Sequence, residues 1–210
     1  MTNIIIVDDH PIVRQGLKQV LSEEPDMAMF GEAQNSQEVL ELIRKQDWDI
    51  VVLDISMPGR GGLDVLKEIK HEQPKLPVLI LSIHPEDQYA VRALKAGASG
   101  YLTKESAPEE LVRAIRKILR GGKYVSSTLA EKMAFSLETE AEKPLHETLS
   151  DREYQVMLMI ASGKTTSAIA EEMSLSIKTV STYRARILEK MKMKSNADLT
   201  YYVIKNNLID

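Results

Sequence analysis

The sequence predicts two domains: an α/β sandwich with a parallel sheet over residues 1–122, and a small all-helical domain over residues 148–210. Apolar runs such as Ile4–Val7 recur between amphipathic segments, and strands buried on both faces of a parallel sheet have such unbroken apolar runs. After residue 147 the strand-like runs stop and helical patterns follow one another. Residues 123–147 are the predicted linker between the two domains.

Five predicted strands alternate with five predicted helices in the first domain. The strands cover Asn3–Val7, Met27–Ala33, Ile50–Leu53, Pro77–Ser82 and Gly100–Leu102. Three of the helices begin at Pro11, Leu63 and Glu86. The other two follow the predicted caps Asn35 and Ser106, and Ser106 is predicted to form a capping box with Glu109. Because each strand is followed by a helix, the connections are crossovers and the sheet is parallel.

Charged and hydroxyl side chains follow the predicted strands at the points where they end. These residues are Asp8, Asp9, Asp54, Ser82 and Lys104. Functional residues of parallel α/β sheets gather beyond the carboxyl ends of the strands, so we expect them to meet. Three carboxylates at one edge repel each other without a cation, and hard oxygen ligands suit Mg²⁺. Mg²⁺ and an ammonium group also stabilise phosphoryl transfer, for which Asp54 is the candidate nucleophile.

Four motifs in this region resemble those of receiver domains in two-component response regulators. They are VDDH at 7–10, LDISMPGRGG at 53–62, LSIH at 81–84 and AGASGYLTKE at 96–105. The resemblance implies a flavodoxin-like fold with strand order 2-1-3-4-5. It also implies that Asp54 is the phosphoacceptor and that a sensor histidine kinase is the phosphoryl donor.

The resemblance also implies a role for each site residue. Asp9 and Asp54 would bind Mg²⁺ through their side chains, Ser56 through its backbone carbonyl, and Asp8 through water. Lys104 would contact the phosphoryl group. Ser82 would supply the switch hydroxyl, and the rotamer of Tyr101 would follow the movement of Ser82. Many receivers have proline after the lysine, often with a cis peptide bond; this chain has Glu105 there, so the geometry of that bond is an open question.

The linker and the second domain have distinct patterns. Residues 128–137 could form one short helix, and residues 138–147 are acidic and contain Pro144, which predicts a mobile segment. Ser150 and Glu153 then form a capping box for the first helix of the second domain. A short helix, a tight turn and the longer helix Ile177–Met191 follow, which is the helix-turn-helix plan.

The longer helix is basic: residues 178–194 hold six basic residues and one acidic residue. Charge alone favours a polyanion partner and a plain solvated helix face about equally. The whole string from Leu149 to Leu199, however, resembles LuxR-type DNA-binding domains. Together with the receiver it indicates the NarL/FixJ class, and KTVSTYRARILEKM at 178–191 is similar to the branch that contains GacA, UvrY and BvgA.

The resemblance makes Ile177–Met191 the recognition helix for double-stranded DNA. The implied DNA-contacting residues are Lys178, Thr179, Ser181, Thr182, Arg184 and Ala185. The residues expected to face the core are Ile177, Val180, Ile187 and Leu188. In the family the last helix pairs two such domains. The residues expected to do so here, in a homodimer formed on phosphorylation, are Leu199, Tyr202 and Val203.

Composition limits the other function classes. The chain has 210 residues, 43% of them hydrophobic and 28% charged, and no cysteine, which excludes disulfides and thiolate metal sites. No apolar run approaches the roughly 18 residues of a membrane helix, and the N-terminus lacks a basic n-region, so we expect a cytoplasmic protein without membrane contact. The four histidines form neither a metal motif nor a catalytic triad, so no independent enzyme is expected.

Two alternatives remain to be weighed against a phosphorylation-controlled transcription factor. A receiver that signals only through protein contacts would have no use for the LuxR-type tail. A constitutive DNA-binding protein with a vestigial receiver would have no use for the complete set of strand-end residues. Both features therefore favour the transcription factor.

Overall fold

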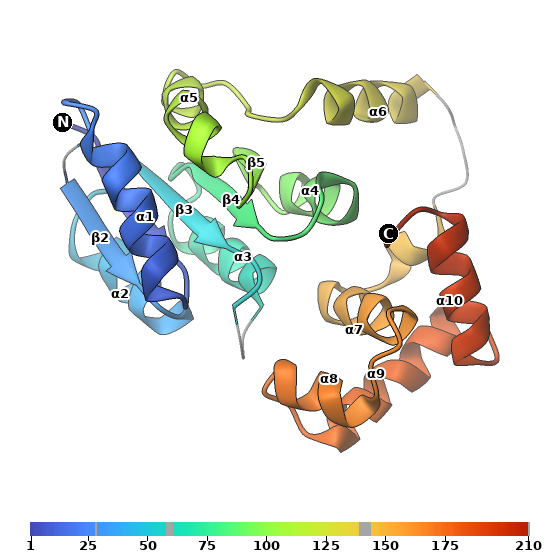
Figure 1. Ribbon diagram of the computed structural model, residues 1–210. Helices are drawn as coiled ribbons and strands as arrows, with labels where there is room; N and C mark the ends of the chain where they lie inside the picture. Colours follow the sequence, from blue (N-terminus) through green and yellow to red (C-terminus); the bar gives the residue numbers. More distant parts are fainter. Residues whose placement is uncertain (28, 58–60, 139–143, 210) are drawn as a thin grey trace. The chain divides into compact units, whose positions relative to one another are not determined.

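A computed structural model of the chain describes residues 1–27, 29–57, 61–138 and 144–209 (Figure 1). It divides into two compact units, Met1–Phe135 and Ser136–Asp210. Each unit has its own buried core, as the two different patterns in the sequence indicate. Among the described residues, no helix combines the length and the apolar character needed to cross a membrane.

The first unit is built on a five-stranded sheet whose neighbouring strands are all parallel. Its strands are β1 (Asn3–Val7), β2 (Met29–Ala33), β3 (Ile50–Asp54), β4 (Val78–Ser82) and β5 (Gly100–Thr103). Their order is β2-β1-β3-β4-β5, which confirms the predicted topology. β3 and β4 are buried along their whole length, as expected for strands covered on both faces.

Helices cover both faces of the sheet (Figure 1). On one face, α1 (Pro11–Ser22) and α5 (Ala107–Leu119) pack on alternate strand residues such as Ile4 and Ile6. The other face has α2 (Ser36–Lys45), α3 (Gly62–Glu72) and α4 (Glu86–Lys95). Side chains alternate across a strand, so each strand contributes to both layers of the core.

The helix starts agree with the predicted caps except at α5. The Asn35 side chain accepts the backbone N–H of Glu38, as predicted. Ser106 makes no side-chain cap, so the predicted capping box with Glu109 is wrong. A capping residue has an extended backbone, but Ser106 has φ −83° and ψ −12° and is already helical. Its hydroxyl bonds instead to Thr103 at the end of β5.

Two glycines allow close packing near the strand ends. A side chain on Gly62, at the start of α3, would lie 2.3 Å from the Ile55 Cα and 2.6 Å from the Asp54 carbonyl oxygen. A side chain on Gly100 would lie 2.7 Å from the carbonyl oxygen of Tyr124. Only glycine lets α3 begin directly against the residue at the end of β3.

The first unit continues into the segment predicted as linker. Tyr124 pairs with Gly100 beside β5, and its hydroxyl accepts hydrogen bonds from Arg113 of α5. α6 (Ser127–Glu138) follows, with Leu129 buried. The predicted short helix over residues 128–137 is therefore present, one residue longer at each end. Half of the acidic stretch 138–147 predicted to be mobile, residues 139–143, lies outside the described residues.

The second unit is all-helical. Its elements are a 3₁₀ turn (η1, Leu145–Thr148), α7 (Asp151–Ala161), α8 (Thr166–Glu172), α9 (Ile177–Lys190) and α10 (Asn196–Lys205). Each α-helix begins after a serine or threonine whose hydroxyl accepts a backbone N–H one turn on. These caps are Ser150, Thr165, Ser176 and Ser195. Ser150 forms the predicted capping box with Glu153.

Candidate functional site

The strand ends of the first unit bring four of the predicted site residues together. Asp8, Asp54 and Ser82 are fully buried. Lys104 reaches between the two carboxylates: its Nζ lies 2.6 Å from Asp8 Oδ2 and 2.8 Å from Asp54 Oδ2. Residues 50 and 96 positions apart in the sequence therefore form one buried charge cluster, which only the parallel topology can assemble.

Burial and pairing act in opposite directions on this cluster. Burial raises the pKa of the Asp54 carboxyl, although Lys104 and the Ser56 backbone N–H, 2.7 Å from Asp54 Oδ1, both stabilise its charged form. Burial by itself would lower the pKa of Lys104, but the bonds to Asp54 and Asp8 outweigh it and raise that pKa. Lys104 is thus held as a cation facing Asp54.

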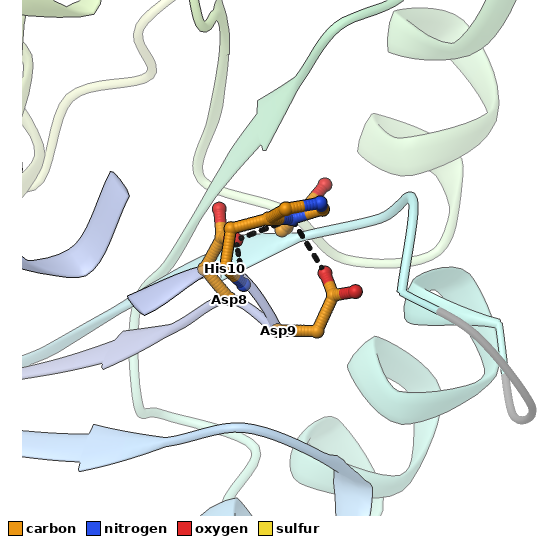
Figure 2. Close-up of side chains that lie close together, drawn as sticks. Asp8, Asp9 and His10 are labelled. Carbon is orange, nitrogen blue, oxygen red and sulfur yellow. Dashed lines mark hydrogen bonds and ion pairs between the residues drawn. The ribbon is translucent and has the colours of Figure 1, made fainter. Parts of the chain in front are cut away.

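A second group of ligand atoms shares Asp8 and Asp54 with this cluster, and Figure 2 shows its members Asp8, Asp9 and His10. One ligand atom from each of Asp8, Asp9, His10 and Asp54 can be chosen so that all four lie within 4.8 Å of one another. Asp9 Oδ1 is buried without a hydrogen-bond donor among the described residues, although His10 Nδ1 is 3.0 Å away. Three carboxylates with a buried orphan oxygen fit a hard divalent cation such as Mg²⁺.

Two residues near this cluster were missed by sequence reasoning. Arg14 of α1 is buried, and its guanidinium donates to the Asp8 carbonyl at 2.7 Å, which holds the end of β1 in place. His10 follows the acidic pair directly, and its backbone N–H donates to Asp8 Oδ1 at 2.8 Å. The only sequence signal for His10 is its position next to the two aspartates, because a single histidine matches no ligand motif.

The predicted switch residues share one partner, the backbone of His84. The Ser82 hydroxyl accepts the His84 N–H at 2.9 Å, and the Tyr101 hydroxyl donates to the His84 carbonyl at 2.9 Å. Tyr101 is fully buried. The Lys104 N–H also donates to the Ser82 carbonyl at 2.7 Å, so β4 and β5 are joined at the site. The described residues contain no cis peptide bond, so the Lys104–Glu105 bond is trans.

The predicted recognition helix α9 presents a polar face to solvent. Lys178, Ser181, Thr182 and Ala185 are exposed, and Thr179 and Arg184 are half-buried. Arg184 Nε donates to Asn196 Oδ1 of α10 at 2.7 Å. The polar face is therefore accessible along the length at which the resemblance expects DNA contacts.

The opposite face of α9 forms part of the core, with one exception to the prediction. Val180 and Ile187 are fully buried and Leu188 is half-buried. Ile177 is 53% exposed, so its predicted core position is wrong. It is the first residue of α9, and the buried face begins one turn later, at Val180.

The structure also corrects the predicted pairing residues of α10. Leu199 and Val203 are fully buried in the core of their own unit, so they have no surface to offer a second chain. Tyr202 is half-buried, and its hydroxyl lies 3.0 Å from His146 Nδ1. The exposed apolar residues of α10 are Tyr201 and Ile204, at 68% and 57% exposure.

Comparison with known families assigns both units. Residues 4–116 match the response regulator receiver domain, and residues 147–203 match the bacterial regulatory proteins of the luxR family. Response regulators of this kind are DNA-binding regulators and are not classed as enzymes.

Individual relatives match along the whole chain. The response regulator UvrY of Escherichia coli K12 is 36% identical over 99% of this chain and 96% of its own. The response regulator GacA of Pseudomonas aeruginosa is 35% identical over 100% and 99%. A structure of two RcsB dimers bound to two parallel DNAs is 26% identical, covers 100% of this chain and 99% of RcsB, and has a TM-score of 0.60. This chain therefore belongs to the two-component response regulators, in which phosphorylation of a receiver domain by a histidine kinase controls DNA binding by a LuxR-type helix-turn-helix domain.

Proposed function

We propose that Asp54 is the residue of this receiver that accepts the phosphoryl group. The observation that carries the proposal is the buried contact of Asp54 with Lys104 at the end of β3. In the transfer, an Asp54 carboxylate oxygen forms a bond to phosphorus while the bond from phosphorus to the kinase histidine nitrogen breaks. The product is an acyl phosphate, whose new negative charge lies next to the Lys104 ammonium.

The remaining site residues have separate roles in this proposal. Asp9 and Asp54 hold Mg²⁺ through their side chains, Ser56 through its backbone carbonyl and Asp8 through water. Bound Mg²⁺ supplies positive charge that offsets the phosphoryl oxygens. Lys104 moves its contact from Asp54 Oδ2 to the phosphoryl group, and the bond to Asp8 keeps its ammonium at the site during this change.

Ser82 and Tyr101 transmit the change to the receiver surface. A phosphoryl group that attracts the Ser82 hydroxyl takes it away from the His84 N–H and so breaks the hydrogen bond between them. The Tyr101 hydroxyl donates to the carbonyl oxygen of His84, so this hydrogen bond must also change when the His84 backbone moves. The surface altered in this way lies between β4 and α4. Such an equilibrium needs only a few kcal/mol of bias.

In the second unit, α9 is the helix that enters the DNA major groove. The proposed contacts are Lys178, Thr179, Ser181, Thr182, Arg184 and Ala185. Arginine and lysine supply phosphate affinity and read guanine edges, and hydroxyls contact phosphates. We place the receiver within residues 1–122 and the DNA-binding domain within 148–210, in a cytoplasmic protein, as is typical of the family.

The active form is proposed to be a homodimer on DNA. Tyr201 and Ile204 of α10 lie one helical turn apart and are both exposed, so they replace Leu199 and Val203 as the proposed pairing residues; Tyr202 borders this surface. RcsB is seen as dimers bound to DNA. Two-fold pairing places two recognition helices on half-sites about 10 base pairs apart.

The proposal is tested on the full chain treated with acetyl phosphate and Mg²⁺. One phosphoryl group per chain, lost in Asp54→Asn, is the expected labelling result. DNA binding and sedimentation of the treated and untreated chain then show whether phosphorylation strengthens pairing. Tyr201→Ala should weaken pairing, whereas Lys178→Ala, an exposed position on α9, should not. Labelling that survives Asp54→Asn contradicts the assigned acceptor, and equal dimerisation and DNA affinity in both states contradict the switch.

A further inference from the structure

We propose that His10 supplies an imidazole ligand to the metal site of the receiver and makes the site favour a first-row transition cation, such as Mn²⁺, over Mg²⁺. The inference rests on the proposed metal site and adds a ligand to it. The atoms proposed to hold Mg²⁺, on Asp8, Asp9, Asp54 and Ser56, are all oxygens, whereas His10 offers a nitrogen atom.

The position of the His10 ring is the first argument (Figure 2). His10 Nδ1 lies 3.0 Å from Asp9 Oδ1 and 3.3 Å from Asp8 Oδ1. Two ligands at neighbouring corners of an octahedron, each about 2.1 Å from the ion, are about 3 Å apart. The ring nitrogen and Asp9 Oδ1 therefore already have the spacing of adjacent ligands around one ion.

The orientation of these atoms is the second argument. Asp9 Oδ1 is buried and accepts no hydrogen bond from the described residues, even though His10 Nδ1 is 3.0 Å away. The hydrogen bond of His10 Nδ1 is instead with Asp8 Oδ1, 3.3 Å away, so Asp9 Oδ1 keeps its lone pairs for another partner. A buried carboxylate oxygen with unused lone pairs is suited to binding a cation.

The two oxygens of Asp8 separate this position from Lys104. Asp8 Oδ2 accepts the Lys104 ammonium, whereas Asp8 Oδ1 faces the His10 side chain and backbone. Lys104 thus occupies one side of the carboxylate and leaves the other for water bound to the proposed ion. The His10 side chain is 63% exposed, so the ring can adjust its angle to an ion without displacing any core residue.

A nitrogen ligand changes which ion the site prefers. Mg²⁺ binds oxygen almost exclusively and retains its water, whereas imidazole is a good ligand for transition metals. Affinity for sites with nitrogen rises from Mn²⁺ along the first-row series. Loss of the ring should therefore weaken the binding of Mn²⁺ much more than that of Mg²⁺.

The contrasting explanation is that His10 is only a hydrogen-bond donor to the acidic pair. A donor of that kind affects all divalent ions in the same proportion, because it acts on the charge of the carboxylates and never touches the ion. The ratio of the two affinities separates the explanations, whereas the loss of one affinity alone does not.

The test measures Mn²⁺ binding to the full chain by the loss of the free-ion electron paramagnetic resonance signal, and Mg²⁺ binding by competition. His10→Ala should lower Mn²⁺ affinity at least about tenfold and Mg²⁺ affinity by much less. His71→Ala, which removes a histidine at the end of α3, should change neither. Pulsed measurements on bound Mn²⁺ should show coupling to a nitrogen nucleus that disappears in His10→Ala and remains in His71→Ala.

An unchanged ratio of Mn²⁺ to Mg²⁺ affinity in His10→Ala, or bound Mn²⁺ without nitrogen coupling in the parent protein, overturns the inference. Asp9→Asn should weaken the binding of both Mn²⁺ and Mg²⁺. If it weakens the binding of neither ion, the metal site is wrongly placed and both proposals about it are wrong. The measurements involve no phosphorylation, so a different phosphoacceptor would leave their outcome unchanged.

Discussion

The charged residues of the receiver site and those of the recognition helix have opposite surroundings. Asp8 and Asp54 are buried and bonded to Lys104, whereas Lys178 and its neighbours on α9 face solvent. A buried charge destabilises the fold strongly if its partner is removed, whereas an exposed charge contributes little to stability. Substitutions at the receiver site should therefore change folding and chemistry together, whereas substitutions on the DNA-facing side of α9, such as Lys178→Ala, should change binding alone.

The largest expected effect concerns Lys104. Lys104→Met leaves two buried carboxylates without their cation and should lower the free energy of unfolding of the receiver by about 3 kcal/mol. Mg²⁺ should stabilise this variant more than it stabilises the parent, because the ion takes over part of the charge balance. Urea denaturation with and without Mg²⁺ measures both effects. If Lys104→Met is as stable as the parent, the buried charges of the receiver do not affect stability more than the exposed charges of α9.

The second effect concerns α9. Arg184→Ala should weaken specific DNA binding by about 1–3 kcal/mol and lower its salt dependence, with little change in the unfolding transition. Lys205→Ala removes the same charge from α10 and is the matched control. Binding titrations at several salt concentrations measure the effect. If Arg184→Ala unfolds the domain, its bond to Asn196 is structural and the comparison must be redrawn.

The third prediction sharpens the comparison through pH. Folding raises the pKa of the Asp54 carboxyl. Such a group contributes to the stability of the fold at pH values below its pKa in the unfolded chain, and this contribution is lost as the pH rises through its pKa in the folded protein. At neutral pH the Asp54 charge therefore opposes folding. Asp54→Asn should therefore stabilise the metal-free receiver at pH 7, because it removes this charge while Asp8 keeps Lys104 paired. The difference should vanish in acid, and a constant difference between pH 4 and 8 would show that Asp54 does not titrate as inferred.

The smallest expected effect lies within the DNA-binding unit, where Glu153 is a buried acid. Its Oε2 atom accepts a hydrogen bond from Lys190 Nζ at 2.6 Å and another from the Ser150 backbone N–H at 2.8 Å. Burial opposes its charge, but these bonds outweigh burial and lower its pKa. Its contribution to stability is present above the unfolded pKa and lost as the pH falls through the folded one.

Lys190→Met should accordingly cost about 1 kcal/mol at neutral pH, reduced from the value for a fully buried pair because Lys190 is partly exposed. The cost should shrink in acid, as Glu153 takes up a proton. Hydrogen exchange of α7 and α9 in the full chain measures it. A cost as large as that of Lys104→Met would show that partial exposure does not weaken this ion pair.

Much of this arrangement could be predicted because its signals are local. The apolar runs mark each strand, so the end of β3 and the position of Asp54 follow directly from the sequence. The helix caps at Ser150, Ser176 and Ser195 are equally local. The parallel order then brings the strand-end residues to one edge of the sheet.

The errors arose where tertiary packing decides. α10 has two apolar edges, and only its packing against α7 decides that Leu199 is buried and Tyr201 exposed. Ser106 has the residue type of a cap, but the bond of its hydroxyl to Thr103 requires the end of β5. His10 became notable only when the distance of its ring from Asp9 was known.

The serine and threonine caps of the second unit have a consequence for refolding. Each of its α-helices is started by a side chain next to it in the sequence, whereas the receiver sheet must pair strands that are far apart in the chain. Units rich in local contacts fold faster than units that depend on distant pairings. A denatured chain should thus regain its DNA-binding unit first and pass through a short-lived form in which the helix-turn-helix is folded and the receiver is not.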